Sequence, residues 1–337
     1  MISSKEVWQR GAMKFRLWTV LLCTAAMIFV AASGVRAQSS TKIPRLGWLQ
    51  PNASATSYYK TFYQGLHELG YIEGKNIEIV TRSADGNPDR LPELARDLTR
   101  LDLDALFTSG DQGLRAAKAA TNTVPIVVVV CDSLDSLVAS IARPGGKATG
   151  LTCISSEIAG KRLQMLKELI PELTRVAVLY NPEDQNKVAE LSQMEIAARK
   201  LGMSIQAHEA RSAEEIDRRF DAFRDSRPQA LIILTDLLMV NQERRLAELT
   251  LKTKLPAIFG FREFADAGGL ASYGAPLNEV VRRAASYVDK VLKGADPGEL
   301  PIEQPTKFEF VINLKTAKAL GITPPPSVLT LADDVIE

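Results

Sequence analysis

The run Ile126-Val127-Val128-Val129-Val130-Cys131 contains no polar residue, and four consecutive members of it are valines. Valine is β-branched and packs well on the pleated surface of a sheet. A strand with one face in water alternates apolar and polar residues, and this run does not alternate. The run therefore predicts a strand that is buried on both faces, as in a parallel sheet covered by helices.

The chain around this strand repeats one pattern from Pro44 onward. Short apolar runs alternate with amphipathic stretches, which is typical of a parallel sheet with helices on both faces. Helix 58–69 carries apolar residues at helical spacing, and Asn87-Pro88 supplies an N-cap and a first-turn proline for the next helix. The expected strands of this first unit are 45–50, 77–82, 105–108, 126–131 and 148–154.

The same pattern starts again after Ile154 and predicts a second unit. Its expected strands are 176–180, 204–208, 230–234, 257–259 and 270–273, and its expected helices are 157–169, 188–201, 213–224, 242–252 and 277–292. Ser212 and Glu215 form a capping box at the start of one of them. A Pro-rich tail from Leu300 adds a strand at 308–312 and a helix at 314–320. We therefore expect an α/β protein with two doubly wound parallel-sheet lobes.

The first 37 residues have the composition of a secretory signal. Lys14 and Arg16 precede an apolar run of 16 residues, Leu17–Ala32, and Val35-Arg36-Ala37 places small residues at a cleavage position. The run is shorter than the roughly 20 apolar residues of a membrane-spanning helix, which argues against an uncleaved anchor. We expect cleavage near Ala37, a mature chain that begins near Gln38, and a periplasmic location.

Two details of this leader bear on processing. Cys23 does not indicate a lipoprotein, because Leu22 stands where a lipobox needs a small residue. The true start of translation is open between Met1 and Met13.

Removal of the leader leaves 300 residues, enough for two domains of about 150 residues each. The leader holds five basic residues and one acidic residue, so the formal charge falls from +1 for the whole chain to −3 for the mature chain. Nucleic acid and anionic membrane surfaces call for clustered Lys and Arg, which this chain lacks. Carboxylates with a Lys or Arg nearby on helix faces are expected at the surface. The partner is expected to be a small molecule.

Cys131 and Cys153 are the two cysteines of the mature chain. An oxidising compartment favours a disulfide between them, and strands that are parallel neighbours about 4.8 Å apart would allow it. Two small apolar residues packed separately are the alternative, and the sequence leaves both open. These cysteines and the isolated His67 and His208 do not make a zinc site, so no metal is expected.

Motifs for catalysis and for cofactors are absent at the expected positions. The first strand is followed by Gln50-Pro51-Asn52-Ala53-Ser54, which is not a Gly-rich nucleotide turn. Pro144-Gly145-Gly146-Lys147 lacks the rest of a phosphate loop and is expected to be a tight turn. Thr108-Ser109-Gly110 follows a strand, but no Gly stands two residues before Ser109, so there is no nucleophile elbow. We expect neither an enzyme nor a cofactor.

Small polar residues and a few aromatic ones follow the strands instead. The carboxyl ends of strands are where open α/β sheets bind ligands, and hydroxyls, amides and helix N-termini suit a small polar molecule. The alternative is that the polar residues are ordinary N-caps and that the aromatic ones are core. The expected ligand-binding residues are Gln50, Asn52, Ser54, Ser109, Asp111, Gln112, Asp132, Asn181, Asp236, Phe259 and Tyr273.

Five motifs resemble one family. They are Gly145–Gly150, Lys161-Arg162-Leu163, Tyr180-Asn181-Pro182, Leu292–Pro297 continuing to Leu300-Pro301, and Asn313–Ala317. Together they are similar to the ABC-transporter substrate-binding proteins of the tryptophan/phenylalanine-binding kind, over Pro44 to Val335. The motifs are most specific at the C-terminal end.

This resemblance implies a periplasmic-binding fold of type I, with two lobes that close on a ligand about a three-strand hinge. The crossovers are expected near 154–157, 273–277 and 292–301. The N-terminal lobe is expected to contain 43–155 plus about 277–298, and the C-terminal lobe 156–276 plus about 299–337. The protein would be a monomer that delivers a small polar solute, such as an aromatic amino acid, to a membrane permease and ATPase.

The resemblance also implies roles for particular residues. The segment Ser109–Gln112 would meet a ligand carboxylate and Asp236 an α-amino group. Where the family often has Asp-Asn this chain has Asp236-Leu237, and Lys147-Ala148 departs from the Gly-Gly-Asn that often precedes the Thr-Gly. One alternative function is a ligand-sensing module for a membrane receptor or kinase. Another is an exported α/β hydrolase, which would need a nucleophile and base that are not found.

Overall fold

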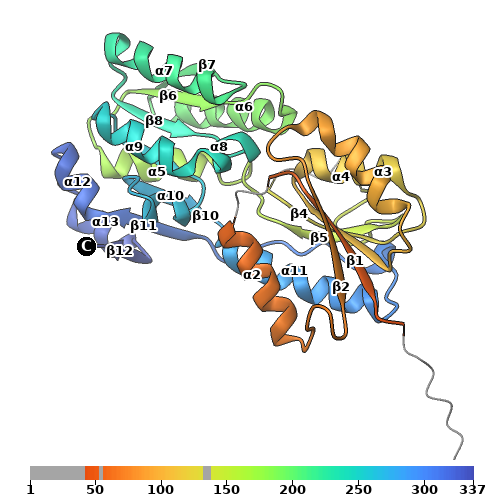
Figure 1. Ribbon diagram of the computed structural model, residues 1–337. Coiled ribbons are helices and arrows are strands. Elements are labelled where there is room, and N and C mark those ends of the chain that lie inside the picture. Colours follow the sequence, from red (N-terminus) through yellow and green to blue (C-terminus); the bar gives the residue numbers. More distant parts are fainter. Residues whose placement is uncertain (1–41, 53–55, 132–137) are drawn as a thin grey trace, which may run out of the picture. The chain divides into compact units, whose positions relative to one another are not determined.

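The computed structural model describes residues 42–52, 56–131 and 138–337 (Figure 1). The description below concerns the unit Pro44–Glu337. The expected leader and its cleavage position lie outside the described residues. Within the described ranges, no helix combines the length and the apolar character that crossing a membrane requires.

The first sheet is entirely parallel, with the order β2-β1-β3-β4-β5. Its strands are β1 (Arg45–Gln50), β2 (Glu78–Ser83), β3 (Ala105–Ser109), β4 (Ile126–Val130) and β5 (Ala148–Thr152). Val127 and Val129 of β4 pack in one core with α2 (Thr56–Glu68) and α11 (Leu277–Leu292). Val128 and Val130 pack in another core with α3 (Leu91–Thr99) and α4 (Gly110–Ala120). The valine run is therefore covered on both faces, as its sequence predicts.

The second sheet has the order β12-β11-β10-β9-β8-β6-β7 and is parallel except for the β10–β11 pair. Its strands are β6 (Arg175–Tyr180), β7 (Ser204–Glu209), β8 (Ala230–Ile233), β9 (Ala257–Phe259), β10 (Ala271–Gly274), β11 (Glu309–Asn313) and β12 (Asp334–Ile336). The fold class expected from the sequence, an α/β protein with two doubly wound parallel-dominated sheets, is confirmed.

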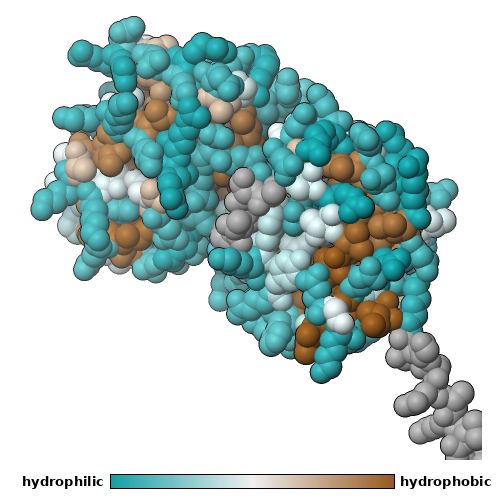
Figure 2. Space-filling view, in the orientation of Figure 1, coloured by the Kyte–Doolittle hydropathy of each residue, from teal (hydrophilic) through white to brown (hydrophobic). Residues whose placement is uncertain are grey.

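Helices cover both faces of this second sheet. Side chains of α5 (Ala159–Leu169) and α6 (Gln185–Lys200) lie in one core, and those of α7 (Ala213–Ser226), α9 (Glu243–Lys252) and α10 (Arg262–Asp266) lie in the other. The remaining helices of the unit are α8 (Leu237–Asn241), α12 (Leu314–Leu320) and α13 (Pro326–Leu331). The visible face of the molecule is mostly hydrophilic, with smaller hydrophobic areas, because these apolar side chains point inward (Figure 2).

The helix caps follow the sequence signals with one difference. Asn87 accepts a hydrogen bond from the Asp89 N–H over 3.1 Å and opens the 3₁₀ turn Pro88–Arg90 that leads into α3. Ser212 accepts from the Glu215 N–H over 3.3 Å, as a capping box requires. The Glu215 carboxylate, however, accepts from the Arg211 N–H over 2.9 Å instead of from Ser212, so the box closes one residue earlier.

The chain passes between the two sheets at three places. The first passage follows β5, where Ile154 has a left-handed φ of 46°, and the second lies between β10 and α11. The third was expected near 292–301, but Glu303 still pairs with Leu151 of the first sheet. The Glu303 N–H donates to the Gly150 carbonyl over 3.0 Å, so the passage comes after Glu303, on the way to β11.

Candidate functional site

A cavity of about 210 Å³ lies where elements that follow strands of both sheets meet. This volume is below the roughly 300 Å³ at which pockets for drug-sized ligands begin, so it suits a small molecule. Most of its polar lining follows the carboxyl ends of strands, the position that open α/β sheets use for ligands, and Arg211 and Asn241 also contribute. From the first sheet these residues are Asn52, Ser109, Gly110, Asp111 and Gln112, and from the second Asn181, Glu183, Asp184, Thr235 and Asp236.

Six of the residues expected from the sequence line this cavity, namely Asn52, Ser109, Asp111, Gln112, Asn181 and Asp236. Ser54 and Asp132 lie outside the described residues. Gln50, Phe259 and Tyr273 do not line the cavity. Gln50 is buried in β1, Phe259 is fully buried and stacks on Phe264, and the Tyr273 ring packs against Phe308. For the two aromatic residues, the structure matches the alternative of core packing at strand ends.

Much of the apolar wall consists of residues that the sequence did not mark for binding, such as Tyr58 and Tyr59 of α2. Phe261 before α10 also contributes its ring, and its place after a strand left pocket and core both open in the sequence. Tyr59 belongs to the apolar stripe of its helix and also packs edge-on against Trp48. Apolar residues at helical spacing indicate packing in the core. The one signal for a role in the cavity was the position of Tyr58, in the first helical turn after a strand. Aromatic rings offer a large contact area to an apolar side chain.

Asp236 places a carboxylate in this cavity. It is the N-cap of α8, where its Oδ1 accepts from the Met239 N–H over 2.9 Å. Its Oδ2 accepts from Nδ2 of Asn181 over 2.8 Å. Asn181 is buried at the end of β6. These donors are neutral, so they orient the carboxylate without cancelling its charge, and the charge can attract a ligand cation.

Two further aspartates face the same cavity. Asp184 caps α6, and burial raises its pKa; the charge of Lys187 opposes this rise, whereas the charges of Asp236 and Asp111 add to it. Asp111 bonds to Arg115 over 2.7 Å through Oδ2. Burial is the main cause of this rise, and the smaller contributions of Asp236 and Asp111 place the three carboxylates within reach of one another, where a cationic group would be favoured.

The start of α4 offers the opposite polarity. This helix begins at Gly110, immediately after β3, and the Ser109 side chain makes no capping hydrogen bond. The first N–H groups of a helix have no partner within it and carry a partial positive charge. Gly110 has φ 73°, which suits glycine at this sharp turn. The Ser109–Gln112 end of the cavity therefore has the polarity that would suit an anionic group.

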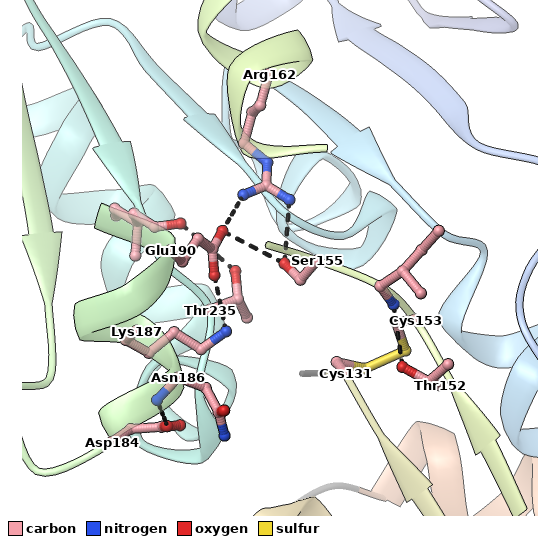
Figure 3. A network of polar contacts seen from close by, with 12 residues as sticks. Cys131, Thr152, Cys153, Ser155, Arg162, Asp184, Asn186, Lys187, Glu190 and Thr235 are labelled. Carbon is pink, nitrogen blue, oxygen red and sulfur yellow. Dashed lines mark hydrogen bonds and ion pairs between the residues drawn. A yellow bond between two sulfur atoms is a disulfide. The ribbon is translucent and has the colours of Figure 1, made fainter. Parts of the chain in front are cut away.

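A buried ionic network stands beside the cavity (Figure 3). Glu190 of α6 accepts from Arg162 Nη1 over 2.8 Å and from Lys187 Nζ over 2.9 Å, and all three side chains are at most 1% exposed. Burial alone would raise the pKa of Glu190, but Lys187 and Arg162 outweigh it, so the pKa lies below its usual value. The expectation that such helix-face pairs are solvated fails here, because α6 packs this face against α5.

Arg162 also contacts the segments on which the chain passes between the sheets. Its Nη2 donates to the Ser155 hydroxyl over 3.3 Å, just after the first passage. Its Nε donates to the Tyr273 carbonyl over 3.1 Å, just before the second. One guanidinium therefore fixes both segments relative to α6, whose N-cap Asp184 lines the cavity.

Cys131 and Cys153 form a disulfide with a Cα–Cα distance of 4.2 Å (Figure 3). They follow β4 and β5, which are parallel neighbours. Neighbouring parallel strands are the arrangement in which the sequence allowed a disulfide between these two residues. Cys131 also lines the cavity, so the bridge joins the cavity wall to the first passage. Among the residues that the structure describes, no group of three or more His, Cys, Asp or Glu is arranged to hold a metal ion.

Comparison with known proteins identifies related sequences. The family described as ABC transporter substrate binding protein matches residues 52–336. The Tyrosine-binding protein of Clostridioides difficile (strain R20291) is 25% identical over 265 residues, which is 78% of this chain and 76% of that protein.

Solved structures share the fold over most of the chain. A conserved domain protein from Vibrio cholerae superposes with a TM-score of 0.81 at 26% identity, over 87% of this chain and 100% of that one. An ABC domain from Streptococcus pneumoniae in complex with L-Trp superposes with a TM-score of 0.80 at 24% identity, over 87% of this chain and 99% of that one. The second likeness concerns the fold alone.

Proposed function

This chain belongs to the ABC transporter substrate binding protein family, and from that premise we propose that it is an exported receptor that captures an amino acid for an import system. It is a binding protein and not an enzyme, and the family resemblance found in its motifs is confirmed. The proposed partners are the permease and the ATPase of the membrane. The proposed location is the periplasm, after cleavage near Ala37, and the proposed state is a monomer.

The observation that carries the amino-acid proposal is the pairing of two opposite polarities in one cavity. The Asp236 carboxylate, oriented by Asn181 and the Met239 N–H, suits an α-ammonium group. The start of α4 suits an α-carboxylate. An amino acid carries both groups on one carbon, and the tyrosine-binding relative supports this ligand class.

The aromatic rings in the wall support a large apolar side chain on that amino acid. Tyr58, Tyr59 and Phe261 line the cavity together with Leu277 and Val281, so the side-chain end of the ligand would be surrounded by apolar groups.

In this proposal the N-terminal lobe comprises 43–155 with 277–303, because Glu303 still pairs with the first sheet. The remaining residues from 156 form the C-terminal lobe.

A thermal-shift screen of the mature chain against the common amino acids, sugars and nucleosides tests the proposal. A ligand at 100 times its Kd stabilises the folded state by about 2.7 kcal/mol, which corresponds to a rise in Tm of about 5–10 °C. We expect such a rise with at least one amino acid. Rises with sugars or nucleosides only would contradict the amino-acid assignment.

A further inference from the structure

One hydrogen bond in the cavity lining joins a residue that follows the first sheet to a residue that follows the second. Nδ2 of Asn52 donates to Oδ1 of Asn241. Asn52 comes two positions after β1, and Asn241 is the last residue of α8, which follows β8. Both residues line the cavity, and Asn52 is buried. We call this hydrogen bond the latch, because it connects the two sides of the cavity directly.

The backbone of Asn52 is held by other parts of the first sheet's side. Its carbonyl accepts a hydrogen bond from the Tyr59 hydroxyl of α2, whose ring also lines the cavity. The adjacent Pro51 carbonyl accepts from the Gly86 N–H over 2.9 Å, so the segments that follow β1 and β2 are joined. The Asn52 amide therefore extends from a backbone that two neighbouring segments hold in place.

The Asn241 side chain meets this side of the cavity at a second point. A β-carbon placed on Gly86 would lie 3.4 Å from Nδ2 of Asn241, so the amide lies beside the Gly86 backbone. Gly86 has a φ of 83°, in the left-handed region that favours glycine. The amide of Asn241 thus reaches the segment after β2 with its nitrogen and the segment after β1 with its oxygen.

The helix that carries Asn241 also follows the carboxylate proposed for the ligand ammonium. Asp236 is the N-cap of α8, and Asn241 ends it. Five residues of helix rise about 7.5 Å, at about 1.5 Å per residue. Between the two ends, Leu237, Leu238 and Val240 line the cavity. One short helix therefore has the proposed ammonium contact at its start and the latch at its end.

We propose that Asn52 and Asn241 are positioning residues that hold the two lobes together over a bound ligand, so that the latch sets how long the ligand stays. The inference rests on the proposed function. A ligand enclosed between two lobes leaves when they separate about the hinge, and separation breaks the latch. The latch forms after the ligand has entered, so it slows dissociation and has little effect on association.

The expected effect is that of one ordinary hydrogen bond. Both partners of the latch are neutral amides, and water can solvate each of them when the lobes open. The net contribution of such a bond corresponds to about a fivefold change in a rate constant. In this role Asn52 acts on the ligand through Asn241 and not by direct contact.

The mature chain contains its own probe for the test. Of the three tryptophans, Trp8 and Trp18 lie in the expected leader, so Trp48 is the only one that remains. Its ring packs edge-on against Tyr59, with 4.9 Å between ring centroids, and Tyr59 bonds to Asn52. Selective excitation of tryptophan leaves free L-tyrosine dark. Stopped-flow fluorescence of Trp48 can therefore give the association and dissociation rate constants for L-tyrosine separately.

Asn241→Leu removes the acceptor of the latch at a similar side-chain size. We expect its dissociation rate constant to rise about fivefold and its association rate constant to stay as in wild type. Asn52→Leu should behave in the same way, and the double variant should release L-tyrosine no faster than either single variant, because one bond is lost in all three. Gln193→Leu, which replaces an exposed amide of α6, is the matched control and should behave as wild type.

An unchanged dissociation rate constant in Asn241→Leu would overturn the inference. So would a double variant in which the two single effects multiply, because the two amides would then act independently.

Small-angle X-ray scattering of the same proteins without ligand separates these outcomes from failure of the proposed function. Without the latch the lobes should open more often, so the radius of gyration of Asn241→Leu should exceed that of wild type and of Gln193→Leu. If L-tyrosine binds to none of the proteins, tyrosine binding fails while a larger radius in Asn241→Leu still supports the latch. Equal radii in all three proteins would reject the latch as well.

Discussion

Asn181 donates a hydrogen bond from Nδ2 to Oδ2 of Asp236 over 2.8 Å. The two residues are 55 positions apart, but they follow β6 and β8, which are paired neighbours in the second sheet. The resembling family often has an Asn directly after this Asp, and this chain has Leu237 there. The amide beside the carboxylate therefore comes from the neighbouring strand, and the proposed ammonium site has an oriented acid.

Replacing Asp236 by Asn should weaken amino-acid binding about 30-fold. The variant keeps an oxygen that can cap α8, but it loses the charge, and a hydrogen bond to a charged group contributes about 2 kcal/mol. Calorimetry of the purified variant measures the change in Kd. The matched control is Asp225→Asn, an exposed aspartate of α7 that should bind as wild type. Unchanged affinity in Asp236→Asn would remove this residue from the site.

Replacing Arg162 by Met should lower the free energy of unfolding by about 3–5 kcal/mol. The substitution leaves the fully buried Glu190 with Lys187 as its cation and removes the donors to Ser155 and Tyr273. Urea denaturation measures the loss. Arg199→Met, at an exposed position on α6, should cost far less. Equal small losses in both variants would mean that the network contributes little to stability.

Acidification should destabilise the protein partly through Glu190. Its folded pKa is depressed, so its contribution is present above the unfolded value and is lost as the pH falls through the folded pKa. Stability should therefore decline from about pH 5 downward. Glu190→Gln should be less stable near neutrality but should show a shallower decline in acid. Parallel curves from urea titrations at several pH values would contradict this.

The disulfide predicts a simple thiol count. Mature protein unfolded without reductant should expose no free thiol, and it should expose two after reduction, because Cys131 and Cys153 are bridged. Reduction should cost roughly 3 kcal/mol, since the bridge closes a loop across 22 positions in sequence. Two thiols that react without reductant would show that the residues are packed separately.

The sequence predicted the strands well because most of them are short apolar runs buried on both faces. The elements that it did not predict include α8, α10, α13 and β12, which have only three to six residues and are too short for a period to appear. The antiparallel β11 was placed correctly along the chain, but its direction depends on where the tail crosses. That crossing follows the pairing of Glu303 with Leu151, a contact between distant segments.

The polar part of the cavity could be anticipated, and the part of the wall that comes from α2 could not. Asn52, Ser109 and Asp236 follow strands, and topology alone brings strand ends together. Tyr58 belongs to a helical stretch rich in core residues, and nothing in its spacing shows that its ring lines a cavity. Glu190 and Lys187 have the spacing of a solvated surface pair, and only the packing of α5 on α6 buries them.

The most direct test of the central claim compares L-tyrosine with two analogues by calorimetry on the mature protein. Tyramine lacks the carboxylate that the start of α4 would hold, and 3-(4-hydroxyphenyl)propanoate lacks the ammonium that Asp236 would hold. A site built for both groups leaves its own polar atoms unpaired when either is missing. We predict that L-tyrosine binds and that each analogue binds about 100-fold more weakly or not at all. Equal affinity for either analogue would contradict the claim that this cavity recognises the two charged groups of an amino acid.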